Sequence, residues 1–228
     1  MTDTPTTRRA LIAAAGAGLA AASFGAPVFA QSGGTQSKGP TAAPLTAEQK
    51  ALVDKATGYI QALSAAKGRF IQTDQRGTVT QGTLFLQRPG KARFAYEGAS
   101  GLLVVSNGNN VNIFDSRLKT FESYPLSRTP LALLLAREVR LDRGVIITDV
   151  RQLADGFTIV AQDARRQTLG RISLDFSSAP VGLIGWTVSD VKGGQIRVRL
   201  VDFEKTGELD PKLFVLTDPR QRRAGAKS

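Results

Sequence analysis

The chain of 228 residues contains neither cysteine nor histidine. Without cysteine there is no disulfide, no thiol nucleophile and no cysteine that could be acylated to make the protein itself a lipoprotein. Without histidine, the commonest general base and the commonest protein ligand of metal ions are both missing. These absences exclude Ser-His-Asp and Cys-His catalytic sites. They also leave packing alone to stabilise the core.

The acidic residues do not supply a replacement. Asp115, Asp149, Asp163 and Asp175 are scattered over turns and strand ends, at spacings that bring no particular pair together. Hydrolysis by carboxylates needs two of them at a defined separation. We therefore expect no enzyme activity, no metal and no cofactor, and a hydrolase acting on envelope polymers is disfavoured.

Acidic residues are also outnumbered by basic ones, which gives a net charge of +11. Such an excess favours anionic partners, whether acidic lipid surfaces, lipopolysaccharide or nucleic acid. The charge does not choose among them. An exported protein rarely meets nucleic acid, however, and we expect no nucleic-acid partner.

Export is indicated by residues 1–30, which read as a signal peptide. Arg8 and Arg9 precede an Ala/Gly-rich apolar stretch at residues 11–24, and a small residue ends the segment at Ala30. The stretch is too short and too rich in glycine for a convincing transmembrane helix. The paired arginines also resemble a twin-arginine signal, and the sequence leaves twin-arginine and Sec export equally open.

Composition divides the rest of the chain into three parts. Residues 31–44, rich in Gly, Ser, Thr, Gln and Pro, are expected to form a flexible linker. Residues 45–219 form the single domain, and residues 220–228 a basic disordered tail. We expect the mature protein to begin near Gln31 and to be a soluble monomer.

The domain opens with a helix. Thr46 is suited to the N-cap and Gln49 to the third helical position of a capping box. Apolar residues then recur at helical spacing, and the helix is expected to end between residues 65 and 68. The stripe either packs on a core or covers a cavity as a lid. Its members are Leu52, Val53, Ala56, Ile60 and Leu63.

From residue 69 the apolar period changes to two, which is typical of strands. Arg88-Pro89-Gly90 and the run at residues 107–110 read as tight turns. The expected strands are residues 69–72, 78–88, 91–97, 102–106, 111–115, 119–124, 145–152, 157–162, 171–176, 184–191 and 195–203, with a last short one at 213–216.

A short helix interrupts this run of strands. Thr129 can cap it, Pro130 suits the first helical position, and Leu131, Leu134 and Leu135 follow. About eleven or twelve consecutive strands predict one antiparallel, highly curved sheet or a barrel-like sandwich. Both helices must bury an apolar face, for which the concave side of the sheet is the natural place.

The stretch GTLFLQRPGKARFAYEG at residues 82–98 joins two of these strands. One face carries Leu84, Leu86 and then Arg88, and across the turn Phe94 and Tyr96. The apolar members either form ordinary sheet core or line a cavity. Arg88 is either a solvated strand end or a donor that holds the mouth of that cavity shut.

The same stretch resembles the GxLxxxRPxxFxWxY block of the LolA-type outer-membrane lipoprotein carriers. Phe70-Ile71-Gln72 is similar to the family's F-x-Q strand, Val105 to Gly108 to its VSDG turn, and Thr129 to Leu135 to its T-P-x-x-L-L lid helix. Phe94 and Phe114 stand where the family often has Trp and Tyr. The agreement covers residues 46–137, and the second half agrees only in its strand rhythm.

The resemblance implies an unclosed half-barrel of about eleven antiparallel strands, capped by the N-terminal helix and the mid-chain lid helix. It implies a periplasmic chaperone that shields the acyl chains of triacylated lipoproteins. Its partners would be an inner-membrane ABC transporter that supplies cargo and an outer-membrane acceptor, or the outer membrane itself. An envelope lipid-sensing regulatory module of similar fold is the alternative.

The resemblance also assigns roles to individual residues. It makes Arg88 the arginine that hydrogen-bonds the sheet rim to the lid. The other residues expected in the acyl cavity and its lid are apolar or aromatic: Phe70, Leu84, Leu86, Phe94, Tyr96, Phe114, Leu131, Leu134 and Leu135.

Overall fold

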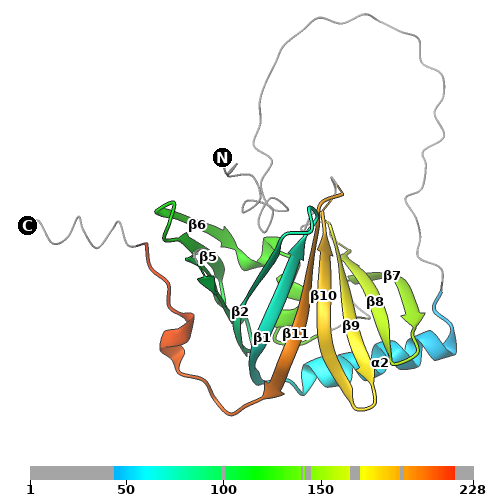
Figure 1. The fold of residues 1–228 in the computed structure, drawn as a ribbon. Helices are drawn as coiled ribbons and strands as arrows, with labels where there is room; N and C mark the ends of the chain where they lie inside the picture. Colours follow the sequence, from blue (N-terminus) through cyan, green and yellow to red (C-terminus); the bar gives the residue numbers. More distant parts are fainter. Residues whose placement is uncertain are drawn as a thin grey trace, which may run out of the picture.

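The computed structural model describes residues 44–98, 101–139, 141, 145–164, 170–190 and 193–218. The predicted signal peptide, nearly all of the predicted linker and the basic tail lie outside these residues. Within them, the chain forms one antiparallel sheet of 11 strands with order β6-β5-β4-β3-β2-β1-β11-β10-β9-β8-β7. The two edge strands, β6 and β7, do not pair with each other, so the sheet is an unclosed half-barrel (Figure 1). The predicted fold class is confirmed.

The sheet consists of two meanders joined through the first and last strands, β1 and β11. The strands are β1 (Ala65–Asp74), β2 (Val79–Gln87), β3 (Lys91–Tyr96), β4 (Leu102–Asn107), β5 (Asn110–Asp115), β6 (Thr120–Pro125), β7 (Val145–Gln152), β8 (Gly156–Asp163), β9 (Arg171–Ser178), β10 (Val181–Ser189) and β11 (Gln195–Lys205). The pairing of β1 with β11 brings residues more than a hundred positions apart in sequence side by side.

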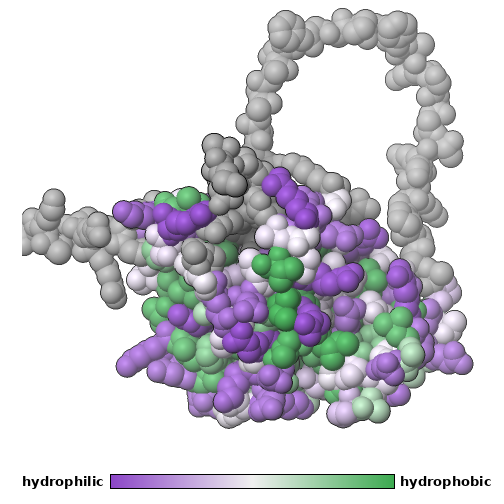
Figure 2. Space-filling model, in the orientation of Figure 1, coloured by the Kyte–Doolittle hydropathy of each residue, from purple (hydrophilic) through white to green (hydrophobic). Residues whose placement is uncertain are grey.

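Alternation along the strands fixes which face is buried. In β2 and β3 every second residue is buried, and Leu84 pairs directly with Phe94. In β11, Arg197 and Arg199 are exposed on either side of the buried Val198. Since neighbouring side chains of a strand point to opposite faces, the sheet has one apolar and one largely polar face. Hydrophilic side chains are frequent on the face seen in Figure 2.

The N-terminal helix α2 (Ala47–Gln61) begins with the predicted capping box between Thr46 and Gln49. Its stripe buries Val53, Ala56 and Ile60, and α2 packs against β7 and β10. Within the described residues, no helix combines the length and apolar character needed to cross a membrane.

Helix α2 ends earlier than predicted, at Gln61 rather than between residues 65 and 68. Ala65 and Ala66 instead begin β1, where they pair with Gln87 and Leu86 of β2. Alanine favours helices, but this propensity is worth less than 1 kcal/mol per residue. Pairing and burial in the sheet override it.

The short strand predicted at residues 213–216 is also absent. A 3₁₀ helix, η4 (Pro211–Phe214), stands there, and the Asp210 side chain accepts a hydrogen bond from the Lys212 backbone N–H. Pro211 has no N–H to give to a ladder. Phe214, only 2% exposed, packs with η4 against β3 and β4.

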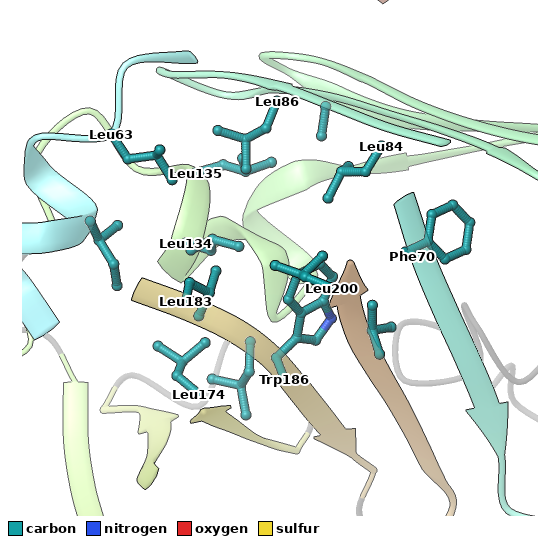
Figure 3. Packing of buried hydrophobic residues seen from close by; sticks show 14 of the residues in the cluster. Leu63, Phe70, Leu84, Leu86, Leu134, Leu135, Leu174, Leu183, Trp186 and Leu200 are labelled. Carbon is teal, nitrogen blue, oxygen red and sulfur yellow. The ribbon is translucent and has the colours of Figure 1, made fainter. Parts of the chain in front are cut away.

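The core lies between the apolar face of the sheet and the two helices (Figure 3). At its β8–β9 end, the rings of Phe157 and Phe176 stack with centroids 5.1 Å apart, and Tyr59 of α2 meets Phe176 edge-on. These aromatic contacts join the helix to the second meander.

Replacing Phe157 by Ala should lower the free energy of unfolding by about 3–5 kcal/mol, because a fully buried ring leaves a cavity. Leu153→Ala is the matched control, since Leu153 lies just before β8 but is 53% exposed. It should change stability by less than about 0.5 kcal/mol. Urea unfolding followed by circular dichroism measures both, and equal losses would contradict the packing described.

Candidate functional site

A cavity of about 270 Å³ lies between the sheet and the segment formed by η3 (Leu126–Arg128) and α3 (Leu131–Leu135). Most of its wall is apolar, and the wall comes from both meanders. The apolar lining residues are Phe94, Val104, Val111, Ile113, Pro130, Leu131, Trp186, Val188, Ile196 and Val198.

Strand alternation places these side chains together. Trp186 pairs with Val198 and Val188 with Ile196 across β10 and β11, so four lining residues form one patch. Val111 and Ile113 of β5 are two apart and so share a face in the same way. Every second residue of a strand faces the cavity, and the residues between them face outward.

An aromatic cluster forms the inner wall. Phe70 is fully buried and meets Phe94 and Tyr96 edge-on, with ring centroids 5.4 and 4.9 Å away. Phe94 meets Trp186 edge-on at 6.2 Å. Edge-to-face contacts of this kind hold the rings in defined positions. These contacts fix the positions of the rings that form this wall of the cavity.

Polar side chains also line the cavity, from β1 and β6, from the β1–β2 and β10–β11 connections and from η3. The Tyr96 hydroxyl donates to Gln72 Oε1 at 2.8 Å, and both residues are buried. Burial raises the pKa of Tyr96, so its hydroxyl keeps its proton. The remaining polar lining residues are Gln75, Tyr124, Arg128, Thr129, Asp190 and Gln195.

Arg88, just after β2, connects three parts of the molecule. Its Nε and Nη2 donate to the Ala136 carbonyl at 3.1 and 2.6 Å, and Nη2 also donates to Arg137 at 3.2 Å. Nη1 donates to the carbonyl of Ile60 in the last turn of α2. Helix C-terminal carbonyls lack intrahelical partners and carry partial negative charge, which suits a cation.

The β2–β3 turn adds backbone bonds to the same junction. The Gly90 N–H donates to the Leu135 carbonyl at 2.8 Å, and the Ser106 hydroxyl donates to the Gly90 carbonyl at 2.6 Å. Gly90 has a φ of +78°, and a Cβ there would lie 2.6 Å from the Gly108 Cα. Only glycine fits this position.

No carboxylate takes part in the Arg88 junction among the residues that the structure describes. Burial lowers the pKa of Arg88 from its ordinary value. A guanidinium keeps its charge in proteins at neutral pH. The cation is balanced by carbonyl dipoles alone. Such bonds contribute about 1.5–3 kcal/mol, and here they tie the residues that follow α3 to the sheet and to the end of α2.

The predicted site residues separate into groups. Phe94, Tyr96 and Leu131 line the cavity. The four leucines behind it are almost fully buried and lie near one another where α3 meets the sheet (Figure 3). Phe70 packs on the aromatic wall, and Arg88 lies outside the lining, bonded to carbonyls after α3 and at the end of α2. The four leucines are Leu84, Leu86, Leu134 and Leu135.

Phe114 lies apart from these groups. Phe114 is half-buried and is not a lining residue. The preceding residue, Ile113, does line the cavity. The resemblance to the family predicted a cavity residue on this strand. The residue of this strand that lines the cavity is the neighbouring Ile113. A one-residue step along a strand moves the side chain to the opposite face.

Several lining residues were not predicted, above all those of β10 and β11 and the polar Gln72. The alternation Trp186–Val188 and Ile196–Val198 would have marked them as one face of a strand pair. It could not have shown that β11 pairs with β1, which places this face opposite α3. In the described ranges, no cluster of side chains could hold a metal ion.

The fold and the cavity together define an open β half-barrel with an apolar binding cavity closed by a short helix. A family model described as outer membrane lipoprotein carrier protein LolA matches residues 61–217. The chain belongs to the LolA family, as its resemblance to LolA-type carriers implied.

Curated relatives agree with this assignment. An outer-membrane lipoprotein carrier protein of Chromohalobacter salexigens is 26% identical over 188 residues, covering 78% of this chain and 89% of the relative. One of Methylococcus capsulatus is 28% identical over 156 residues, covering 65% of this chain and 74% of the relative.

A solved structure, of a LolA superfamily protein of Nitrosomonas europaea, shares 11% identity with this chain. The match has a TM-score of 0.44 and covers 74% of this chain and 97% of that one.

Arg88→Leu should release the α3 segment. We expect backbone amides of residues 131–137 to exchange with solvent about tenfold faster or more, because the three carbonyls lose a charged donor. Arg93→Leu is the matched control. Arg93 is also an arginine whose pKa is lowered by burial, but it donates to Leu213 in the C-terminal segment.

The control should speed exchange near η4 and leave residues 131–137 at the wild-type rate. Hydrogen–deuterium exchange with mass spectrometry resolves the two segments. Unchanged exchange of residues 131–137 in Arg88→Leu would show that Arg88 does not hold them.

Proposed function

We propose that this protein is a periplasmic chaperone that binds the acyl chains of lipoproteins in the cavity and carries them from the inner to the outer membrane. It would receive cargo from an inner-membrane ABC transporter and deliver it to an acceptor in the outer membrane or to that membrane itself. The observation that carries the proposal is an apolar cavity closed by a helix that Arg88 ties to the sheet.

The physical demand on such a carrier fits this site. Each acyl methylene exposed to water costs about 0.8 kcal/mol, so a chain of roughly 15 methylenes costs about 12 kcal/mol. A soluble carrier must cover that surface and later give it up. An apolar wall with a cover held by a few hydrogen bonds meets both requirements.

The size of the cavity supports a cover that moves. At about 270 Å³ it lies just below the usual range of ligand pockets, roughly 300–1,000 Å³. Several acyl chains need more room than that. Displacing the α3 segment, which forms one wall through Leu131 and packs on the sheet through Leu134, would enlarge the space.

Trp186 is the chain's single tryptophan and lines the cavity, so it reports occupancy directly. Binding of an apolar ligand should change the wavelength and intensity of Trp186 emission, and the change should saturate as the cavity fills. An apolar fluorescent dye should bind the native protein without denaturant. A lipoprotein with intact acyl chains should displace it, whereas the deacylated form should not.

Phe94→Glu should weaken dye binding by about tenfold or more, because an unpaired carboxylate in an apolar site is costly. Phe114→Glu is the matched control, since Phe114 is half-buried in β5 but outside the cavity lining. Leu131→Glu at the cavity rim repeats the test without touching the aromatic cluster. If all three variants bind the dye with the same affinity, the cavity is not the binding site for the dye.

Transfer of cargo tests the proposal itself. Arg88→Leu should still take lipoprotein from spheroplasts but deliver it poorly to outer-membrane vesicles, because the closed form loses its bonds while the loaded, open form loses little. Arg93→Leu should do both at the wild-type rate. Uptake of lipoprotein by neither wild type nor control would reject the carrier function.

A further inference from the structure

Among the described residues that line the cavity, Gln72 is a buried polar residue with hydrogen-bonding capacity to spare. It is 7% exposed and lines the cavity, and its Oε1 accepts from the Tyr96 hydroxyl at 2.8 Å. An amide also carries two N–H donors on its nitrogen. Among the described residues, the Gln72 Nε2 donates to none.

Three other buried polar residues in the described ranges are engaged, and the one buried side-chain atom without a partner there is Thr80 Oγ1, outside the cavity lining. Ser106 donates to a backbone carbonyl, and Asn112 both donates to the Leu216 carbonyl and accepts from Ser123. Asp115 accepts from the backbone N–H groups of the turn that follows it. Buried polar groups are nearly always paired. The Gln72 Nε2 has no partner in the described part of the chain and is not among the buried unpaired atoms, so it is accessible from the cavity that Gln72 lines, where a ligand atom can pair with it.

Tyr96 determines which end of the amide is open. Its hydroxyl occupies Oε1 and keeps its proton, so the nitrogen is the end left toward the cavity. The surrounding wall is apolar, with Phe94, Trp186 and Val198 among its members. A ligand atom that meets Nε2 must accept a hydrogen bond and must tolerate these neighbours.

That requirement selects a neutral acceptor. A charged carboxylate or phosphate would lose its hydration here, and the only cationic side chain among the described lining residues is the exposed Arg128. A bare hydrocarbon offers no acceptor. The carbonyl of an ester satisfies both conditions, because it is neutral and joins directly to an alkyl chain.

We propose that the Gln72 Nε2 donates to the ester carbonyl of an acyl-glycerol unit, so that the cavity selects ester-linked acyl chains over plain hydrocarbon. This inference rests on the proposed function and names the feature of the ligand that the site recognises. The carbonyl lies beside Gln72 in the cavity. The alkyl chain runs from there along the apolar wall of β10, β11 and β5.

The test compares two ligands that differ only in the carbonyl. One is a dioctanoyl S-glyceryl-cysteine peptide, and the other is the dialkyl ether with chains of equal length. Both are titrated below their aggregation concentration, with Trp186 emission as the readout. A site built around a donor disfavours a ligand that lacks the acceptor. Wild type should bind the ester about threefold to tenfold more tightly.

Variants assign the preference to the amide. Gln72→Met keeps the length of the side chain but removes its donors, which should abolish most of the preference while ether binding persists. Since the Tyr96 hydroxyl, once released, is itself a donor, the Gln72→Met/Tyr96→Phe double variant should abolish the rest. Gln81→Met is the matched control, because Gln81 is exposed and binds Glu97 outside the cavity.

The same pair of ligands with a phosphatidylglycerol headgroup identifies the source of the ester. Preference for the ester in the peptide series, with or without the phospholipid series, supports the inference. Preference confined to phospholipid overturns lipoprotein as the source. Equal binding of ester and ether, with Trp186 responding to both, overturns the inference and leaves the carrier function standing. No response to any apolar ligand overturns the carrier function.

Discussion

An open sheet needs a cover for its apolar face, and the hydrogen bonds of one arginine to three backbone carbonyls are among the contacts that attach this cover. Because β6 and β7 do not pair, the sheet cannot bury its own apolar face, and helices must cover it. Arg88 joins that cover to the sheet at Ile60, Ala136 and Arg137. Carbonyl acceptors, unlike a carboxylate, form a contact of moderate strength, which is what the proposed carrier function requires of a cover.

The two polar features of the site, Gln72 on β1 and Arg88 after β2, lie beside opposite ends of β2. Gln72 pairs with Thr80 near the start of β2, while Arg88 follows its last residue. Eight residues of strand separate these positions by about 26 Å. Under the proposed function, substitutions can therefore change closure and ligand recognition separately.

Local pattern predicted much of the fold. Alternation in β2 and β3, the two tight turns and the Thr46 capping box are all present. Local pattern failed where a distant partner decided the outcome. Ala65 and Ala66 lie in a strand and not in the helix because β2 pairs with them. Residues 211–214 form a 3₁₀ helix because Pro211 has no N–H for a strand ladder and Phe214 is buried against the sheet. Propensity is too weak to resist such contacts.

The sequence alone determined the class of this protein. The absence of cysteine and histidine removed whole classes of catalytic chemistry, and the regular strands with two apolar helices indicated a curved sheet with a cover. Only the tertiary structure decided which side chains line the cavity. It places Ile113 rather than Phe114 there, brings Trp186 and Val198 opposite α3, and leaves the Gln72 amide open. Alternation marks the faces of a strand, but the β1–β11 pairing that brings these faces together joins residues far apart in sequence, which no local pattern encodes.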